Sequence, residues 1–112
     1  MTSVPILDAS TTIQDASAAM LDSHVEAAIV IDGKKLRGLL TASDIADALA
    51  TGRDTNSTPI AIVTSPDPAL VEAGEPLVYA HERMRAAQQP LAVVIGDDRR
   101  PVGLLADSEA GP

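Results

Sequence analysis

The sequence predicts an α/β fold built from two similar βαββα repeats that pack sheet to sheet about an approximate twofold axis. Three observations predict it: the 112-residue chain matches itself when shifted by 64 positions, each half alternates helix-like with strand-like apolar patterns, and neither half is long enough to stand alone. A unit of about 50 residues buries too little apolar surface for independent stability. We therefore expect a first repeat at residues 1–56 and a second at residues 57–112.

The internal repeat keeps its register over most of the chain. At an offset of 64, Met20 meets Met84 and the run Ala28–Ile31 meets Ala92–Ile95. The next turn is one residue longer in the second half, so the offset becomes 65 and Gly38 meets Gly103. Matches that keep their order and spacing indicate a duplicated unit.

The first half opens with a predicted helix. Ile13, Ala16 and Met20 recur at helical spacing directly after Thr12. Thr12 and Asp15 form a Thr-x-x-Asp pattern that resembles a capping box, which favours a helix starting here.

A buried strand, a hairpin and a second helix are expected next. The run 27–31 is continuously apolar and rich in β-branched residues, as is typical of a strand buried on both faces. Asp32-Gly33 predicts a two-residue hairpin turn, and residues 36–40 form the returning strand. A helix from about Ser43 to Thr51 closes at Gly52, and the polar segment 51–58 is interpreted as a linker.

The second half repeats this plan with one departure. Residues 69–71 predict a short strand, Pro76 opens a helix that carries Leu77, Ala80 and Met84, and residues 91–95 predict a buried strand. A turn at 96–100 leads to a return strand at 102–105. Since the sequence ends at Pro112, we expect the closing helix of this repeat to be missing or vestigial.

Composition argues against several classes of function. The chain carries 8 basic and 16 acidic residues, so its net charge of −8 disfavours nucleic acid and anionic lipid as partners. It has no cysteine, which removes disulfides, thiolate catalysis and zinc–sulfur sites. His24 and His81 lack metal-ligand spacing, and no nucleophile or phosphate-loop motif is present. We expect a soluble cytoplasmic protein that is not an enzyme, with no metal site.

The junction between the return strand and the second helix carries a motif. It runs Gly38-Leu39-Leu40-Thr41-Ala42-Ser43-Asp44. Inside a tandem helix–strand–turn–strand repeat, this segment resembles the signature of the cystathionine-β-synthase-type (CBS) domain family. The resemblance implies a tandem pair of CBS domains, a regulatory module that binds AMP, ADP, ATP or S-adenosylmethionine in clefts between the two repeats.

The same resemblance implies roles for individual residues. Asp44 would bind the ribose hydroxyls, and Thr41 would add a hydroxyl contact. The backbone at Leu39 would meet the adenine edge, and Val25 would lie against the base. Arg53 is the best-placed cation for a phosphate. Because cations are otherwise scarce near the motif, an uncharged or monophosphate adenosyl ligand is favoured over ATP.

Physical chemistry supports this assignment and also offers an alternative. A carboxylate can accept charge-assisted hydrogen bonds from both vicinal hydroxyls of a ribose, and a helix N-terminus offers free N–H groups to a phosphate. Thr41 and Asp44 also have the spacing of a capping box, so the motif can equally serve helix stability alone.

The second half departs from the motif. Ala106 stands where the first half has a threonine, and Glu109 replaces the aspartate. Thr64, Asp67 and Ala69 resemble the upstream half of a family site, and Thr2 matches a threonine at the domain entry. We therefore expect at most one good site in the chain.

Two functional hypotheses follow. The first is a non-catalytic sensor. An adenosyl ligand at the Thr41/Asp44 cleft would shift the relative arrangement of the two repeats, or of two protomers, and an unknown regulated partner would recognise that arrangement. The second is a ligand-free dimerisation or interaction module with degenerate binding motifs. Both hypotheses include a homodimer, because apolar faces would remain on the helices. Neither needs a cofactor other than an adenine nucleotide or S-adenosylmethionine as a regulatory ligand.

Overall fold

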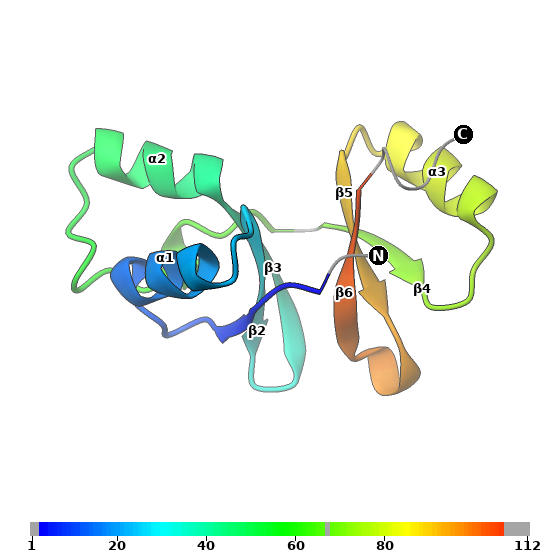
Figure 1. Cartoon of the computed structure of the whole chain (residues 1–112), viewed down its shortest axis with the longest axis horizontal. Coiled ribbons are helices and arrows are strands. Elements are labelled where there is room, and N and C mark those ends of the chain that lie inside the picture. The colour runs from blue at the N-terminus through cyan, green and yellow to red at the C-terminus, as the bar shows by residue number, and fades with distance from the viewer. Residues whose placement is uncertain (1–2, 67, 107–112) are drawn as a thin grey trace. The chain divides into compact units, whose positions relative to one another are not determined.

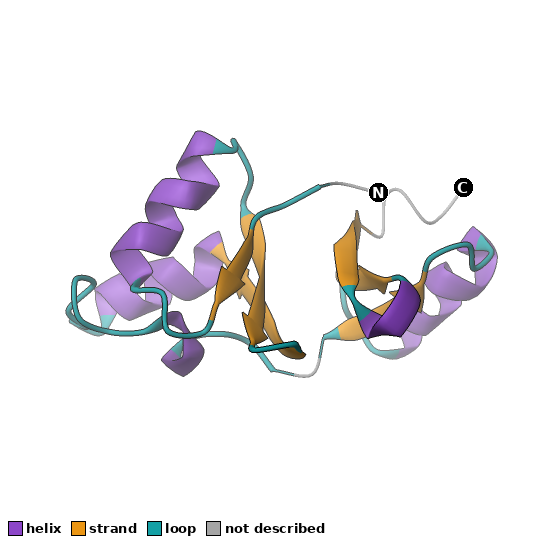
Figure 2. Cartoon of the chain, turned by 90° about the horizontal axis from the view of Figure 1, so that it is seen from below, coloured by secondary structure: helices purple, strands orange, loops and turns teal. Residues whose placement is uncertain are grey.

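A computed structural model describes residues 3–66 and 68–106 of the chain (Figure 1). The described chain forms two compact units, one within residues 4–66 and the other within residues 68–106. Each unit is built on its own three-stranded sheet, with strand order β1-β2-β3 in one and β4-β5-β6 in the other. In each unit the α-helices lie against one face of the sheet (Figure 2). The predicted α/β class with two repeats is confirmed.

The first unit has the predicted βαββα order. It comprises β1 (Ile6–Asp8), α1 (Ile13–Asp22), β2 (Ala27–Asp32), β3 (Lys35–Thr41), α2 (Ala42–Ala50) and a short 3₁₀ helix, η1 (Ile60–Ile62). β1 pairs with β2 in parallel, and β2 pairs with β3 antiparallel. The core lies between the sheet and the helices, and its fully buried side chains include Ile13, Val30, Leu40 and Ile60.

The predicted helix caps are present in the first half, although Thr12 and Asp15 form only one of the two hydrogen bonds of a capping box. Thr12 caps α1, because its Oγ1 accepts a hydrogen bond from the Asp15 N–H at 3.2 Å. α2 begins at Ala42, and Gly52 follows its last turn with a φ of +80°. The N–H groups of Gly52 and Arg53 donate back to the carbonyls of Leu49 and Ala48, each at 3.1 Å. This pair of bonds is the Schellman ending that a glycine allows.

The first hairpin turn lies one residue later than the sequence predicted. Asp32 stays in β2 and pairs with Lys35, so Gly33 and Lys34 form the turn. Gly33 adopts a φ of +65°, which glycine tolerates without strain.

The segment after α2 packs on the first unit, although the sequence analysis assigned residues 57 onward to the second repeat. The Ile13 N–H donates to the Thr58 carbonyl at 3.0 Å, and the Ile60 N–H donates to the Thr11 carbonyl at 2.7 Å. Ile60 is fully buried in the first core. These bonds satisfy the start of α1 and hold η1, which the sequence analysis did not predict, against the first unit.

The second unit follows the same plan over its described part. It comprises β4 (Ala69–Glu72), α3 (Leu77–Ala86), β5 (Leu91–Ile95), the 3₁₀ turn η2 (Asp97–Arg99) and β6 (Pro101–Ala106). Its core includes Ala80, Met84, Ala92 and Leu105. The predicted loss of a closing helix concerns residues 107–112, which lie outside the described part of the chain.

Equivalent irregularities show the duplication in the backbone itself. β2 and β3 shift register between Val30 and Ile31, and β5 and β6 shift between Val94 and Ile95, which is the same place after the 64-residue offset. In both hairpins a glycine pairs with the valine at the shift: Gly38 with Val30, and Gly103 with Val94. A bulge repeated at equivalent positions indicates a feature of the duplicated unit.

Candidate functional site

The start of α2 carries the predicted motif, and it forms a complete capping box. The Thr41 hydroxyl accepts from the Asp44 N–H at 3.2 Å, while Asp44 Oδ2 accepts from the Thr41 N–H at 2.9 Å. The Thr41 hydroxyl also lies 3.0 Å from the same carboxylate oxygen. The structural role that the sequence left open for these two residues is therefore present in the molecule.

Asp44 also binds a residue outside its own helix. The Ser65 hydroxyl lies 3.2 Å from Asp44 Oδ1 and 3.3 Å from Oδ2, so it donates to the carboxylate across a separation of 21 residues. The Ser65 backbone is held against β3 by two bonds to Leu39: the Leu39 N–H donates to the Ser65 carbonyl at 3.1 Å, and the Ser65 N–H donates to the Leu39 carbonyl at 2.8 Å. The carboxylate is thus shared between α2 and the segment that follows η1.

A hollow of about 240 Å³ opens beside this carboxylate within the first unit. Its lining comprises Asp44, Asp47, Ala48, Thr51, Arg53 and Val63. The first four of these residues recur at helical spacing (positions 44, 47, 48 and 51), so they lie on one face of α2. Arg53 comes from the Schellman ending of the same helix, and Val63 from the residue after η1.

The charges around the hollow are unbalanced. Two carboxylates, Asp44 and Asp47, face one guanidinium, Arg53. Asp47 and Arg53 are exposed to solvent, whereas Asp44 is half-buried. Such a lining can accept hydrogen bonds from hydroxyl groups and can bind one anionic group, but a ligand with several negative charges would meet more repulsion than attraction.

The structure brings together only part of the predicted residue set. Asp44 and Arg53 line one hollow, and Thr41 contacts the Asp44 carboxylate. Val25 instead packs against the core of the first unit. Leu39, whose backbone was expected to meet an adenine edge, is buried in β3, and its N–H donates to the Ser65 carbonyl.

Sequence reasoning missed three polar residues of this site: Asp47, Thr51 and Ser65. Asp47 could have been found, because residues three and four positions beyond Asp44 on a predicted helix share its face. Ser65 carried a weaker signal, since it adjoins Thr64, which the resemblance had singled out. Nothing local indicates that a serine 21 residues away reaches Asp44.

The corresponding region of the second unit is only partly described. Ala106, at the end of β6, provides no hydroxyl to match Thr41. The Thr64 hydroxyl donates to the Ile60 carbonyl at 2.6 Å, and Ala69 is buried in β4. Thr2, Asp67 and Glu109 lie outside the described residues.

Two features are absent from the described residues. Among residues 3–66 and 68–106, no helix combines the length and the apolar character needed to cross a bilayer. Within the same ranges, no group of three or more histidine, aspartate or glutamate side chains is arranged to hold a metal ion.

The duplicated sheet units and the glycine-to-aspartate segment at the start of α2 define a class of small α/β domains. Comparison with known proteins identifies the family: residues 1–51 match the family model described as the CBS domain. The chain therefore contains a CBS domain at residues 1–51, and its two units have the fold of solved CBS domain pairs.

Solved structures of CBS proteins share this fold at low sequence identity. A CBS domain protein from Pyrobaculum aerophilum, solved in complex with AMP, matches with a TM-score of 0.82 and 21% identity, covering 97% of this chain and 84% of that one. The CBS domain pair of the protein MJ0100, solved with 5′-methylthioadenosine and S-adenosylmethionine, matches with a TM-score of 0.76 and 24% identity, covering 96% and 89%.

A curated relative is much longer than this chain. The probable arabinose 5-phosphate isomerase of Haemophilus influenzae is 31% identical over 106 residues, which cover 93% of this chain. The chain spans only 31% of the length of that protein.

Proposed function

We propose that the chain is a non-catalytic regulatory module that binds an adenosyl ligand at the hollow beside Asp44. The observation that carries the proposal is the position of the Asp44 carboxylate: it is fixed by the Thr41 backbone N–H and at the same time lines the hollow. A carboxylate held in place can accept both hydroxyls of a ribose without a further loss of side-chain entropy.

The size of the hollow suggests which part of the ligand it receives. Pockets that enclose whole drug-sized ligands usually measure about 300–1,000 Å³, and this hollow measures about 240 Å³. It therefore suits the ribose and its 5′ substituent, with the base extending beyond it. The lone Arg53 guanidinium of the lining favours an uncharged adenosyl compound or a monophosphate over ATP.

Structural neighbours support the ligand class. Proteins with this fold have been solved with AMP, and another with 5′-methylthioadenosine and S-adenosylmethionine. These compounds share an adenosine moiety and differ at the 5′ position. A site that recognises the ribose diol through Asp44 would accept all three, and Arg53 would then select among the 5′ groups.

The regulatory output requires two states of the module with different affinities for the ligand. A ligand that binds both states equally shifts no equilibrium, however tightly it binds. We propose that a partner, either a second copy of the chain or a separate protein, binds the state that the ligand favours.

A thermal-shift and calorimetry panel tests the proposal. Adenosine, AMP, ADP, ATP, NAD, 5′-methylthioadenosine and S-adenosylmethionine are compared against the wild-type chain, the Asp44→Asn variant and the Asp15→Asn variant. The amide introduced by Asp44→Asn keeps an acceptor for the Thr41 N–H but loses the charge. We expect AMP or an uncharged adenosyl compound to raise the Tm of the wild-type chain and of Asp15→Asn, and to lose at least about tenfold in affinity in Asp44→Asn. The proposal is contradicted if no compound raises the Tm of the wild-type chain, or if Asp44→Asn binds the ligand with the affinity of the wild-type chain.

One observation favours the alternative, a ligand-free interaction module. Leu21 on α1 and Leu49 on α2 expose 75% and 59% of their surface within the first unit. Burying these side chains against a second copy would be favourable. Under this alternative, sedimentation would detect a dimer that Leu21→Asp and Leu49→Asp dissociate, and no nucleotide would shift the Tm.

A further inference from the structure

The second unit contains a larger hollow that is distinct from the Asp44 site. It measures about 720 Å³, and its lining comprises Leu70, Glu72, Glu75, Arg83, Ile95 and Arg99. Glu72 is the last residue of β4 and Ile95 the last of β5, and these two strands are parallel. The hollow therefore lies at the carboxyl ends of neighbouring parallel strands, where open α/β sheets commonly bind ligands.

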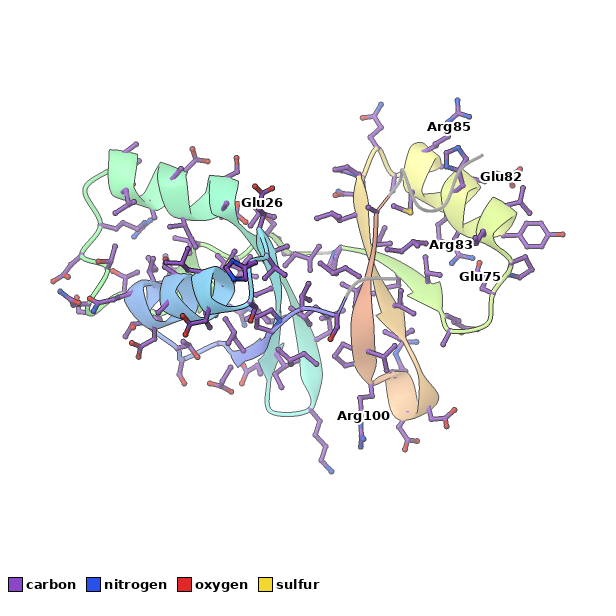
Figure 3. The ribbon with its side chains drawn as sticks, in the orientation of Figure 1. Glu26, Glu75, Glu82, Arg83, Arg85 and Arg100 are labelled. Carbon is purple, nitrogen blue, oxygen red and sulfur yellow. The ribbon has the colours of Figure 1, made fainter. Side chains whose placement is uncertain are left out.

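One wall of the hollow is a fixed ion pair. Arg83 on α3 and Glu75 in the preceding loop lie side by side (Figure 3). Arg83 Nη1 donates to Glu75 Oε2 at 2.9 Å and to the Leu70 carbonyl at 2.9 Å, while Nη2 donates to Glu75 Oε1. Glu75 Oε2 also accepts from the Glu72 N–H at 3.1 Å. The pair is thus anchored to β4 at two backbone groups.

The electrostatics show that this pair is already neutralised. The hydrogen bond from Arg83 lowers the pKa of Glu75, and the hydrogen bond to Glu75 raises the pKa of Arg83. Both groups therefore stay charged over the physiological range and cancel each other. The net charges that remain on the lining are the Glu72 carboxylate and the Arg99 guanidinium.

These two remaining groups come from different elements. Glu72 ends β4, whereas Arg99 belongs to η2 in the hairpin between β5 and β6. Toward the rest of the described chain, neither the Glu72 carboxylate nor the Arg99 side chain makes a hydrogen bond or a salt bridge. The lining also includes two aliphatic residues, Leu70 and Ile95. The hollow thus presents one negative group, one positive group and an apolar surface.

The first repeat shows that the fold does not require the Glu75–Arg83 ion pair. After the 64-residue offset, Thr11 stands at the position of Glu75 and Ala19 at the position of Arg83. The first unit nevertheless forms the same parallel β–α–β arrangement. The ion pair is therefore an addition specific to the second unit.

We propose that this hollow binds a small zwitterion with an aliphatic body, of the class of the free α-amino acids leucine and valine. The ammonium group would bind Glu72, the carboxylate would bind Arg99, and the aliphatic side chain would cover Leu70 and Ile95. A simple anion such as phosphate would be attracted by Arg99 but repelled by Glu72, and a simple amine would be attracted by Glu72 but repelled by Arg99. The proposal is independent of the Asp44 site.

Binding is tested on the full chain by NMR titration and calorimetry with L-leucine and L-valine. Isovalerate supplies the carboxylate without the ammonium, isoamylamine supplies the ammonium without the carboxylate, and inorganic phosphate supplies an anion alone. The variants are Glu72→Gln and Arg99→Gln. Their controls are Glu82→Gln and Arg85→Gln, which change exposed charges on α3 outside the lining (Figure 3).

We expect L-leucine to shift the amide signals of β4, η2 and the start of β6, and to bind at least about tenfold more tightly than isovalerate or isoamylamine. Glu72→Gln and Arg99→Gln should each lose at least about tenfold in affinity for leucine, while both control variants bind as the wild-type chain does. Native amide spectra establish that each variant is folded.

Three outcomes would overturn the proposal. These are no saturable change of amide signals with either amino acid, tighter binding of phosphate than of leucine, or a loss of leucine affinity in the α3 control variants equal to that in Glu72→Gln and Arg99→Gln. Because AMP binding is measured separately in the Asp44 variants, failure here leaves the proposed adenosyl site standing.

Discussion

Gly38 lies so close to the carbonyl group of Ser65 that a Cβ at position 38 would overlap it. The same Cβ would also approach the Thr64 methyl group to 2.9 Å, and the φ of Gly38 is +156°. This close approach lets Ser65 pair with Leu39 and so brings the Ser65 hydroxyl to Asp44. Gly38, the first residue of the motif, thus allows Ser65 to join Thr41 as a hydrogen-bond donor to Asp44, the last residue of the motif.

Replacing Gly38 with alanine should destabilise the first unit strongly. The methyl group would force the backbone at Ser65 away from β3, and we expect a loss of about 3 kcal/mol or more in the free energy of unfolding. Urea unfolding followed by circular dichroism measures it, since Tyr79 is the only aromatic residue. Gly33→Ala is the control: its φ is +65° but nothing lies within 4 Å, so only the backbone penalty of about 1–2 kcal/mol applies. Equal losses in the two variants would contradict this role for Gly38.

The two threonine caps should differ in strength. Thr41→Ala removes a hydroxyl that bonds both the Asp44 N–H and the Asp44 carboxylate, whereas Thr12→Ala removes one bond to the Asp15 N–H. Loss of a cap costs about 0.5–2 kcal/mol, and we expect Thr41→Ala near the upper end and Thr12→Ala near the lower end. Denaturant titration of the two variants checks the order, and the reverse order would show that the additional Thr41 contact contributes nothing.

Removing the Ser65 hydroxyl should strengthen binding of an adenosyl ligand. Ser65 donates to both oxygens of Asp44, so a ribose diol has to displace it. With Ser65→Ala, we expect the Kd for AMP or adenosine to fall about fivefold, the equivalent of one modest hydrogen bond. Calorimetry with the wild-type chain and the variant gives the ratio, and weaker binding in the variant would mean that Ser65 contacts the ligand itself.

Arg53 should discriminate between AMP and adenosine. It is the guanidinium on the hollow's lining and the single group there that can attract a phosphate. In Arg53→Gln we expect AMP to bind no more tightly than adenosine, while adenosine binds as it does to the wild-type chain. Competition titrations with both ligands measure the ratio, and the Arg37→Gln variant, which changes a β3 guanidinium outside the lining, should keep the wild-type preference for AMP.

Acid should weaken the second unit through the Glu75 carboxylate. Its pKa in the folded protein lies below the ordinary value of 4.5, chiefly because Arg83 donates hydrogen bonds to it. The stability that this interaction contributes is fully present at pH values above the unfolded-state pKa. It is lost as the pH falls through the lower pKa of the folded protein, because the unfolded chain takes up a proton at a higher pH than the folded chain does. Hydrogen exchange of β5 amides at pH values on either side of 4.5 follows this loss.

A matched pair of variants isolates that effect. Glu75→Gln should be less stable than the wild-type chain at neutral pH and should show a flatter acid dependence. Glu82→Gln, which changes an exposed carboxylate on α3, should keep the wild-type slope. The Ser10 hydroxyl and N–H lower the pKa of Asp8 in the same direction, so a residual slope from the first unit is expected in both variants.

The regular elements could be predicted from the sequence because each is specified locally. The spacing of Ile13, Ala16 and Met20 fixes which face of α1 is buried, and all three are buried. The run 91–95 is a strand at the predicted bounds. η1 could not be predicted in this way, since its position depends on backbone bonds from Ile60 and Ala61 to Thr11 and Ala9, which lie far earlier in the chain.

The candidate site could be predicted only where it follows one element. Thr41, Asp44 and Arg53 belong to α2 and its caps, so a local motif identifies them. Leu39 exchanges two backbone hydrogen bonds with Ser65, a contact that the sequence around Leu39 does not encode. The hollow of the second unit was also missed, because Glu75 and Arg83 meet only after the loop and α3 have folded over β4.

The bond from Arg83 to the Leu70 carbonyl also covers part of the exposed edge of β4. β4 is an edge strand of its sheet, and an edge strand with unpaired backbone groups can be extended by a strand of another chain. A guanidinium that covers one of these carbonyls, with the Glu75 carboxylate beside it, places charge where such a strand would dock. We therefore expect the side chain that shapes the hollow also to disfavour the addition of a foreign strand at β4.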